Sequence, residues 1–338
     1  MTNDARIDLT DVLEIALQVL ETLGFTQDFS DKVGAIFEGL ADHETREGRR
    51  VVIPAGPGHE ITALHRARVF QSSDPLEEAM KRPDLGLGPP PSRIATAGRM
   101  NAWGISVFYG ALDPTVALAE IRPPVGSRVI VGKFIILRPL RLLDVEALKS
   151  VFVKGSIFDP AFIRKLERAR FLGRLSDRIT RPVMPNDEPT DYLVTQAIAD
   201  YLATEAKLDG IIYPSAQAAG AKKNVVLFHH AARVQLMELP KDTELDAHTS
   251  MSTEEGPEAN YWVWEEVPPE APKAKEEEEG PIFKLPVPAS EASDFEDRET
   301  TLQLDLESLE VHHIEAVQFT TERHAVKRHR SVKGDHPF

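Results

Sequence analysis

A near-continuous apolar run at residues 129–137 is the feature that most limits how this chain can fold. The run is VIVGKFIIL, and only Gly132 and Lys133 interrupt it. A stretch this short and this apolar is typical of a strand with both faces covered. The run therefore predicts a strand in the interior of a sheet.

Further strands and helices are expected on either side of this run. Apolar stretches at 140–145, 210–214 and 225–228 predict buried strands. Two helices begin with aspartate at the N-cap and proline at the first helical position, at 113–114 and 159–160. Residues 59–240 thus mix short strands with helices, and we expect an α+β fold with a mixed, twisted sheet and peripheral helices.

Composition changes suggest four parts. Residues 1–58 carry helical patterns at 8–24 and after Ser30, and a Pro/Gly cluster at 54–58 ends this small helical unit. Residues 59–240 form the main domain. Residues 241–300 are rich in Glu, Pro, Ala and Lys, so we expect them to be disordered or loosely packed.

Three features lie beyond the main domain, in residues 241–300 and in the fourth part, residues 301–338. Residues 261–264, YWVW, predict either a short strand packed on the domain or a motif that docks a partner. In 301–338, apolar alternation predicts strands at 302–306, 311–313 and 314–319 that could pack on the main domain. The basic run 327–330 is either solvated or a nucleic-acid contact.

The overall composition limits the function. The chain has 338 residues, a formal net charge of −15 and no cysteine, which excludes disulfides, cysteine-held metals and a thiol nucleophile. We expect a cytoplasmic protein without a signal peptide or membrane span. Its acidity makes nucleic acid a poor ligand, and any anionic ligand needs a local cluster of arginines or backbone N–H groups.

Glu120 is the most informative charged residue. The helix that starts at Asp113 and Pro114 places Glu120 on the same face as Val116 and Ala117. A carboxylate on an apolar face needs a partner or a purpose. The structural explanation is an ion pair with an arginine at the helix end, such as Arg122, and the alternative is a role in chemistry.

Ser215 follows a predicted buried strand that ends at Pro214. Residues at strand ends of such domains often line ligand crevices, although a serine here can simply cap a turn. The surrounding residues lack the Gly-x-Ser-x-Gly pattern of a hydrolase nucleophile.

Taken in order, several such motifs over residues 59–235 resemble the RES domain family, named for its Arg, Glu and Ser. The matching pieces are Arg66, with Arg68 as a close alternative, the turn Gly98-Arg99-Met100-Asn101, the strand residue Tyr109, Ala117-Leu118-Ala119-Glu120, Pro214-Ser215 and the strand Asn224–Phe228.

The resemblance implies a fold similar to ADP-ribosyltransferases and an enzyme that degrades NAD, as a glycohydrolase or phosphorylase, often as a toxin paired with an antitoxin. NAD is then the substrate, phosphate a candidate co-substrate, and neither cofactor nor metal is expected. The implied catalytic residues are Glu120, Arg66 and Ser215. The implied NAD-binding residues are Arg66, Arg68, Arg99, Asn101, Tyr109, Ser215 and Asn224.

Glu120 would stabilise the cationic ribosyl transition state, while Arg66 and Arg99 would hold the pyrophosphate. Tyr109 would stack on a ring of the substrate, and Ser215 would bind phosphate or orient the acceptor. Alternatives are transfer of ADP-ribose to a macromolecule, or an NAD-sensing module without catalysis. Adjacent histidines at 229–230 and 312–313 are poor metal chelators, because neighbours in a strand point to opposite faces. The sequence does not decide whether the chain forms a homo-oligomer.

Overall fold

A computed structural model describes residue 37 and residues 39–181, 188–218, 220, 222–254, 256–269, 298–318 and 320–330. The helix predicted at 8–24, and most of the one predicted after Ser30, fall outside these residues. No described helix combines the length and the apolar character that a membrane crossing requires.

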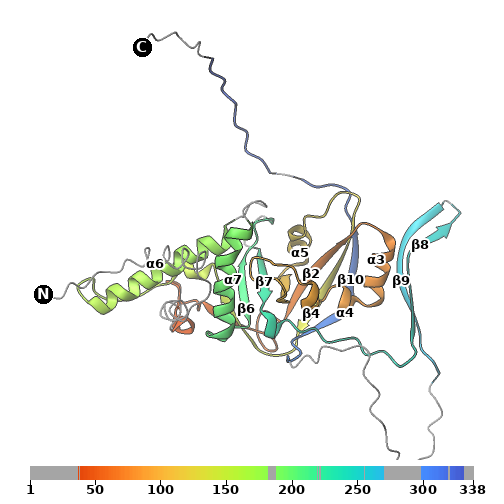
Figure 1. Cartoon of the computed structure of the whole chain (residues 1–338), viewed down its shortest axis with the longest axis horizontal. Helices are drawn as coiled ribbons and strands as arrows, with labels where there is room; N and C mark the ends of the chain where they lie inside the picture. The colour runs from red at the N-terminus through yellow and green to blue at the C-terminus, as the bar shows by residue number, and fades with distance from the viewer. Residues whose placement is uncertain are drawn as a thin grey trace, which may run out of the picture.

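One large mixed sheet organises the described chain (Figure 1). Its strands run in the spatial order β1-β5-β6-β7-β3-β2-β4-β10, and all neighbours pair antiparallel except β5 and β6, which are parallel. The strands are β1 (Val52–Ala55), β2 (Ala63–Phe70), β3 (Phe108–Ala111), β4 (Arg128–Ile136), β5 (Leu140–Asp144), β6 (Gly210–Pro214), β7 (Lys223–Leu227) and β10 (Leu302–His313). The expected α+β class with a mixed sheet is confirmed.

Helices cover both faces of this sheet. They are α3 (Ser73–Lys81), α4 (Pro83–Gly86), α5 (Pro114–Glu120), α6 (Pro160–Thr180) and α7 (Glu188–Thr204), with short 3-10 turns at Leu40–Asp42, Ser92–Ile94, Ala147–Ser150 and His229–Ala231. Asp113 and Asp159 cap α5 and α6 as predicted, each accepting a backbone N–H two residues ahead.

The core divides into three clusters around the sheet. Side chains of α6 and α7 pack on β5, β6 and β7, whereas Leu76 and Ala79 of α3 pack on the opposite face. Val116 and Ala117 of α5 form a third cluster with β2 and β4. The strand predicted at 129–137 is β4, and Phe134 is fully buried in it.

The expected boundary at 54–58 is wrong, because the sheet begins before it. Val52–Ala55 form β1, which pairs with β5, and Val52 lies opposite Leu143. Phe37, Leu40 and Val51 are buried in the same cluster as α6 and α7. The residues just before the Pro/Gly cluster therefore belong to the main body.

Part of the segment expected to be disordered or loosely packed is regular. Residues 244–266 form a two-stranded antiparallel hairpin of β8 (Glu244–Thr253) and β9 (Gly256–Glu266), which lies beside α3 in Figure 1. The strand interpretation of the aromatic run 261–264 holds, since it lies inside β9.

The predicted strands at 302–306 and 311–313 merge into one long strand, β10, that pairs with β4 across a bulge between Asp305 and Glu310. Ile314–Phe319 was predicted as a further strand, and its described residues, 314–318, are not in a strand. The sheet is thus completed by residues far beyond position 240.

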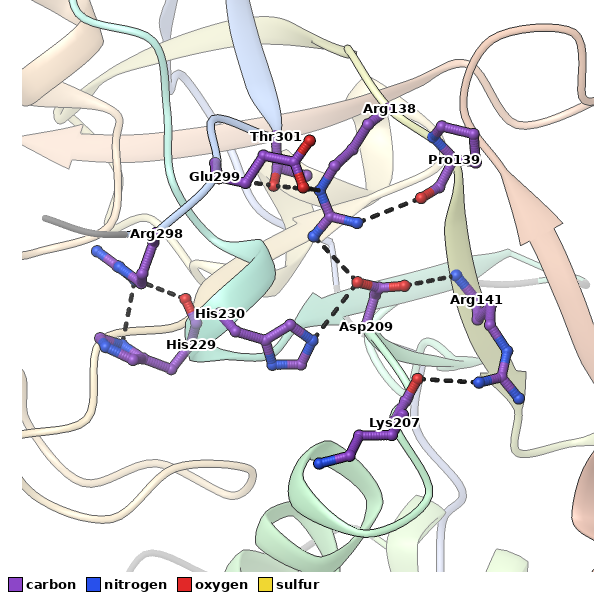
Figure 2. Close-up of polar contacts among 10 residues, drawn as sticks. All are labelled: Arg138, Pro139, Arg141, Lys207, Asp209, His229, His230, Arg298, Glu299 and Thr301. Carbon is purple, nitrogen blue, oxygen red and sulfur yellow. Dashed lines mark hydrogen bonds and ion pairs between the residues drawn. The ribbon is translucent and has the colours of Figure 1, made fainter.

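A polar network fixes the start of β10 to the main domain (Figure 2). The carboxylate of Asp209 accepts hydrogen bonds from Arg138 Nη2 at 3.0 Å and from the Arg141 backbone N–H at 2.8 Å. Arg138 also forms an ion pair with Glu299 at 3.3 Å. The adjacent histidines have different partners in this network. His230 Nε2 lies 3.4 Å from Asp209 Oδ1, whereas His229 contacts Arg298.

Candidate active site

A pocket of about 410 Å³ opens beside the middle of the sheet. This volume falls within the range of small-molecule sites. Its lining comes from β2, the 98–99 turn, β3, α5 and the two residues after it, the end of β6 and the loop that follows, β7, and side chains of α6 and α7. Arginine, glutamate and tyrosine side chains stand among small and apolar residues in the lining, which suits a polar ligand with rings.

The pocket lies where two neighbouring strands separate. β2 and β3 share a single paired position, His65 with Ala111, although each pairs extensively with its other neighbour. The divergence makes room for Arg66, whose guanidinium carbon lies 5.1 Å from the centre of the Phe108 ring. Arg66 therefore reaches the pocket from inside the sheet.

Arg66 lacks a compensating partner on one nitrogen. Its Nη1 is inaccessible to solvent and has no hydrogen-bond partner among the described residues. Burial, reinforced by the nearby Arg68 guanidinium, lowers the pKa of Arg66 to about 10, so the side chain stays charged at neutral pH. A buried cation in this condition is stabilised by an anion placed next to it.

The side chains of Asn101 and Tyr109 hold the turn that carries Arg99. Asn101 is buried and donates through Nδ2 to the carbonyl oxygens of Thr96 and Ile105, each at 2.9 Å. Its Oδ1 accepts the Tyr109 hydroxyl at 2.9 Å, and that hydroxyl accepts the Met100 backbone N–H at 3.1 Å. Asn101 and the Tyr109 hydroxyl thus shape the turn, while Tyr109 also lines the pocket.

Helix α7 fixes the same turn from above. Thr195 Oγ1 donates to the Arg99 carbonyl at 2.6 Å, and Gln196 Nε2 donates to the Gly98 carbonyl at 2.8 Å. The Arg99 guanidinium donates through Nη1 to the Ile179 carbonyl at the end of α6, at 2.7 Å. Arg99 is therefore positioned by two helices at the pocket edge.

Glu120 lines the pocket, and two hydrogen bonds hold its carboxylate in place. Its Oε1 accepts the Ser215 hydroxyl at 2.6 Å and the Asn224 Nδ2 group at 2.7 Å. Both of these hydrogen bonds go to Oε1, and among the described residues no ion pair joins Glu120 to Arg122. The structural explanation weighed from the sequence, a pair with Arg122, does not describe this carboxylate.

Ser215 is itself held in place. Its Oγ accepts the backbone N–H groups of Gln217 and Ala218, each at 3.1 Å, which leaves its own proton for Glu120. Asn224 lies in β7 and is buried, opposite Tyr213 in β6. The Glu120 carboxylate is therefore anchored to two strands of the sheet.

The structure sorts the predicted residues into three groups. Arg66, Arg99, Tyr109, Glu120 and Asn224 line the pocket together. Ser215 and Asn101 support lining residues without lining the pocket. Arg68 lies elsewhere: it is exposed and donates through Nη1 to the Gly86 carbonyl at 2.6 Å.

Sequence reasoning missed several lining residues. They include His65, Arg122, Tyr192 and Tyr213. Burial raises the pKa of Tyr213 well above its usual value and lowers that of His65 below it. Tyr213 stood next to the Pro-Ser motif, which was a usable signal, whereas Tyr192 gave none. Arg122 has a φ of 46°, an unusual backbone conformation for arginine that marks it for attention.

Candidate metal ligands do not gather here. Among the described residues, no group of three or more histidine and carboxylate side chains is arranged to hold a metal ion. What the pocket does combine is an oriented carboxylate, several guanidinium groups and tyrosine rings.

The fold and pocket define an α+β protein with a cationic cleft built around one fixed carboxylate. A family model, described as RES domain, matches residues 63–248, more than half of the chain. The chain belongs to the RES domain family. No curated protein matches it.

Comparison with solved structures finds the crystal structure of the M. tuberculosis MbcT–MbcA toxin–antitoxin complex. The matched chain is 14% identical, the match covers 58% of this chain and 82% of that chain, and the TM-score is 0.28.

Proposed function

We propose that the chain degrades NAD by cleaving the bond between nicotinamide and ribose, and that it acts as a toxin restrained by an antitoxin. The observation that carries the proposal is the Glu120 carboxylate, fixed by Ser215 and Asn224, in one pocket with Arg66, Arg99 and Arg122. The RES family assignment and the family's resemblance to ADP-ribosyltransferases support the same substrate.

The arginines suit the pyrophosphate of NAD. Guanidinium groups bind phosphate oxygens through two parallel hydrogen bonds. Arg66 lines the pocket and has no ion-pair partner among the described residues, so a pyrophosphate bound there would compensate its buried charge. Arg66 is thus the first residue we assign to pyrophosphate binding, with Arg99 and Arg122 at the pocket edge.

The reaction follows from where the charge develops. The electron pair of the ribose–nitrogen bond leaves with nicotinamide, which becomes neutral, and the ribosyl carbon takes on oxocarbenium character. A carboxylate close to that cation stabilises the transition state more than the ground state. We assign this role to Glu120, whose Oε1 is fixed by Ser215 and Asn224 and whose second oxygen accepts no hydrogen bond from a described residue.

An acceptor then completes the transfer. Water adds to the ribosyl carbon and releases a proton, which gives ADP-ribose. Inorganic phosphate adds instead through one oxygen and gives ADP-ribose 1″-phosphate. Tyr109, Tyr192 and Tyr213 line the pocket and offer rings on which nicotinamide or adenine can stack.

The test is a product analysis. Purified protein is incubated with NAD, with and without inorganic phosphate, and the ribosyl product is identified by mass. Free nicotinamide with ADP-ribose or its 1″-phosphate supports the proposal. Labelled ADP-ribose fixed to macromolecules would instead establish a transferase, and intact NAD with measurable NAD binding would establish a sensing module.

A further inference from the structure

The hairpin of β8 and β9 has two chemically different faces. On the inner face Ala247 is 2% exposed, and Thr249 Oγ1 donates to Glu77 Oε1 of α3 at 3.2 Å. The register places Ala247 opposite Val263. This face is packed on the body of the protein, beside α3 in Figure 1.

The outer face carries two tryptophans with acidic neighbours. The register sets Trp264 opposite Asp246 and Trp262 opposite His248. Trp264 is 62% exposed and Trp262 is 39% exposed. Because residues two apart in a strand share a face, both indoles lie side by side there. The His248 ring lies 4.3 Å from the Trp262 ring and helps to hold it.

The charge of this face is unbalanced. Glu244 and Glu266 lie directly opposite each other in the register, and like charges so placed destabilise a strand pair. The sequence from 244 to 266 contains no lysine or arginine. Lys81 of the neighbouring α3 interacts electrostatically with Asp246, but it already forms an ion pair with Glu78 at 2.9 Å. A cation arriving from outside would relieve the repulsion.

Exposed indoles flanked by carboxylates fit guanidinium and ammonium groups. Such groups stack on tryptophan faces and donate hydrogen bonds to carboxylates at the same time. The chain itself carries a segment of this chemistry at residues 323–330, RHAVKRHR. That segment is exposed along its length, as Val326 at 87% illustrates, and it runs away from its own sheet in Figure 1.

We propose that the outer face of the hairpin binds the basic segment 323–330 of a second copy of the chain. Arg328 and Arg330 are two residues apart, as are Trp262 and Trp264. In extended chains this spacing is about 6.6 Å for both pairs, so each guanidinium meets one indole. Glu244 and Glu266 supply the carboxylates around them, whereas Asp246 Oδ2 already lies 3.0 Å from His248 Nε2. This inference is independent of the reaction proposed above.

The first experiment measures binding of a synthetic peptide with the sequence of residues 321–330. Trp103, the remaining tryptophan, is replaced by phenylalanine so that fluorescence reports on the hairpin. The peptide is expected to alter the fluorescence saturably, and the affinity is expected to fall as salt rises from about 0.1 M to about 1 M. A peptide carrying Arg328→Glu and Arg330→Glu is the matched control, and equal binding of both peptides overturns the proposal.

A second measurement keeps the peptide and changes the protein. Glu266→Lys is expected to weaken binding about tenfold, whereas Glu205→Lys, an equal charge change at the end of α7, leaves it unchanged. Equal weakening by both variants means general attraction to an acidic protein and overturns the site.

The third measurement asks whether the contact joins two copies. Sedimentation is compared for wild type, for Arg328→Glu/Arg330→Glu and for Trp264→Ala/Glu266→Lys, all as full chains. Each variant alone is expected to lose self-association, and a mixture of the two is expected to regain it, because one keeps the hairpin and the other the basic segment. Self-association that persists in either variant, or a mixture that stays monomeric, overturns the exchange between copies.

Discussion

The Ser215 hydroxyl donates a 2.6 Å hydrogen bond to Oε1 of Glu120 and joins the end of β6 to the end of α5. The two residues are 95 positions apart in the chain. Asn224 of the neighbouring strand donates to the same oxygen. The carboxylate at the centre of the pocket is therefore held by the sheet rather than by its own helix.

Replacing Glu120 by glutamine tests the charge at this position. The glutamine side chain keeps the size of the glutamate but not its negative charge, so the oxocarbenium-like transition state loses its counter-charge. We expect the rate of NAD consumption to fall about 100- to 1000-fold with little change in the thermal midpoint. A folded variant that consumes NAD at the parental rate would remove Glu120 from the mechanism.

Ser215→Ala tests orientation rather than charge. The change removes the hydrogen bond to Glu120, which is worth about 1.5–3 kcal/mol for a charged acceptor, so we expect a loss of about 10- to 100-fold in kcat. Ser215→Thr keeps the hydroxyl and serves as the control. If alanine and threonine give the same rate, the hydroxyl does not act through Glu120.

Much of the fold could be predicted because its signals are local. Asp113 and Pro114 mark the start of α5, and the apolar run at 129–137 marks β4, whatever surrounds them. β1 escaped prediction because Pro54 lies inside it. The strand is at the edge of the sheet, where a proline costs no hydrogen bond with a further strand. β8 escaped because its polar sequence is stabilised by contact with α3.

The site was predictable only where residues belong to a motif. Arg66, Arg99, Tyr109 and Glu120 follow the order of the family pattern, and they converge on one pocket. Tyr192 reaches the pocket from near the start of α7, and nothing in its local sequence predicts that approach. Conversely, Arg68 matched the family's arginine position almost as well as Arg66, yet its side chain contacts the Gly86 carbonyl. The direction of a side chain depends on what packs around it, which the local sequence does not show.

Arg66→Met separates stability from function. Methionine removes a buried charge with an unsatisfied nitrogen and still contacts the Phe108 ring, so we expect the free energy of unfolding to rise by about 1 kcal/mol. NAD binding should weaken, since the pyrophosphate loses a guanidinium. Arg66→Lys keeps a charge without the fork and should bind with intermediate affinity. Urea unfolding and NAD titration of the three proteins provide the check, and a less stable Arg66→Met would contradict the view that the buried, unsatisfied guanidinium lowers stability.

Gly98→Ala tests the close packing of the Arg99 turn. A Cβ at position 98 would lie 2.7 Å from both Asn101 Oδ1 and the Tyr109 hydroxyl oxygen, closer than such atoms approach in proteins. We expect a loss of about 1–3 kcal/mol in stability, with weaker NAD binding as the turn shifts. Gly173→Ala in α6 also lacks a positive φ, and its Cβ would meet no atom nearer than 3.9 Å, so it controls for added volume without a clash. A stability loss at position 98 no larger than at position 173 would argue against the packing explanation.

Asp209→Asn tests the network that anchors β10, through the pH dependence of stability. Burial raises the pKa of Asp209, but hydrogen bonds from His230, from the Arg141 backbone and from Arg138 outweigh it, so the pKa lies below its usual value. A carboxyl with a lowered pKa in the folded state stabilises the protein above its unfolded pKa, about 3.9, and this contribution disappears as the pH falls through the folded value.

At pH 7 we therefore expect Asp209→Asn to lower the free energy of unfolding by about 2 kcal/mol. The difference from wild type should shrink below about pH 4, because wild-type Asp209 also becomes neutral there. Urea unfolding of both proteins across this range measures the difference directly. The control is Asp305→Asn. Asp305 lies in β10, is more exposed than Asp209 and pairs with Lys133, so its replacement should cost less than about 1 kcal/mol at any of these pH values. A difference between Asp209→Asn and wild type that stays constant from neutral to acid pH would show that the carboxylate charge is not what secures β10.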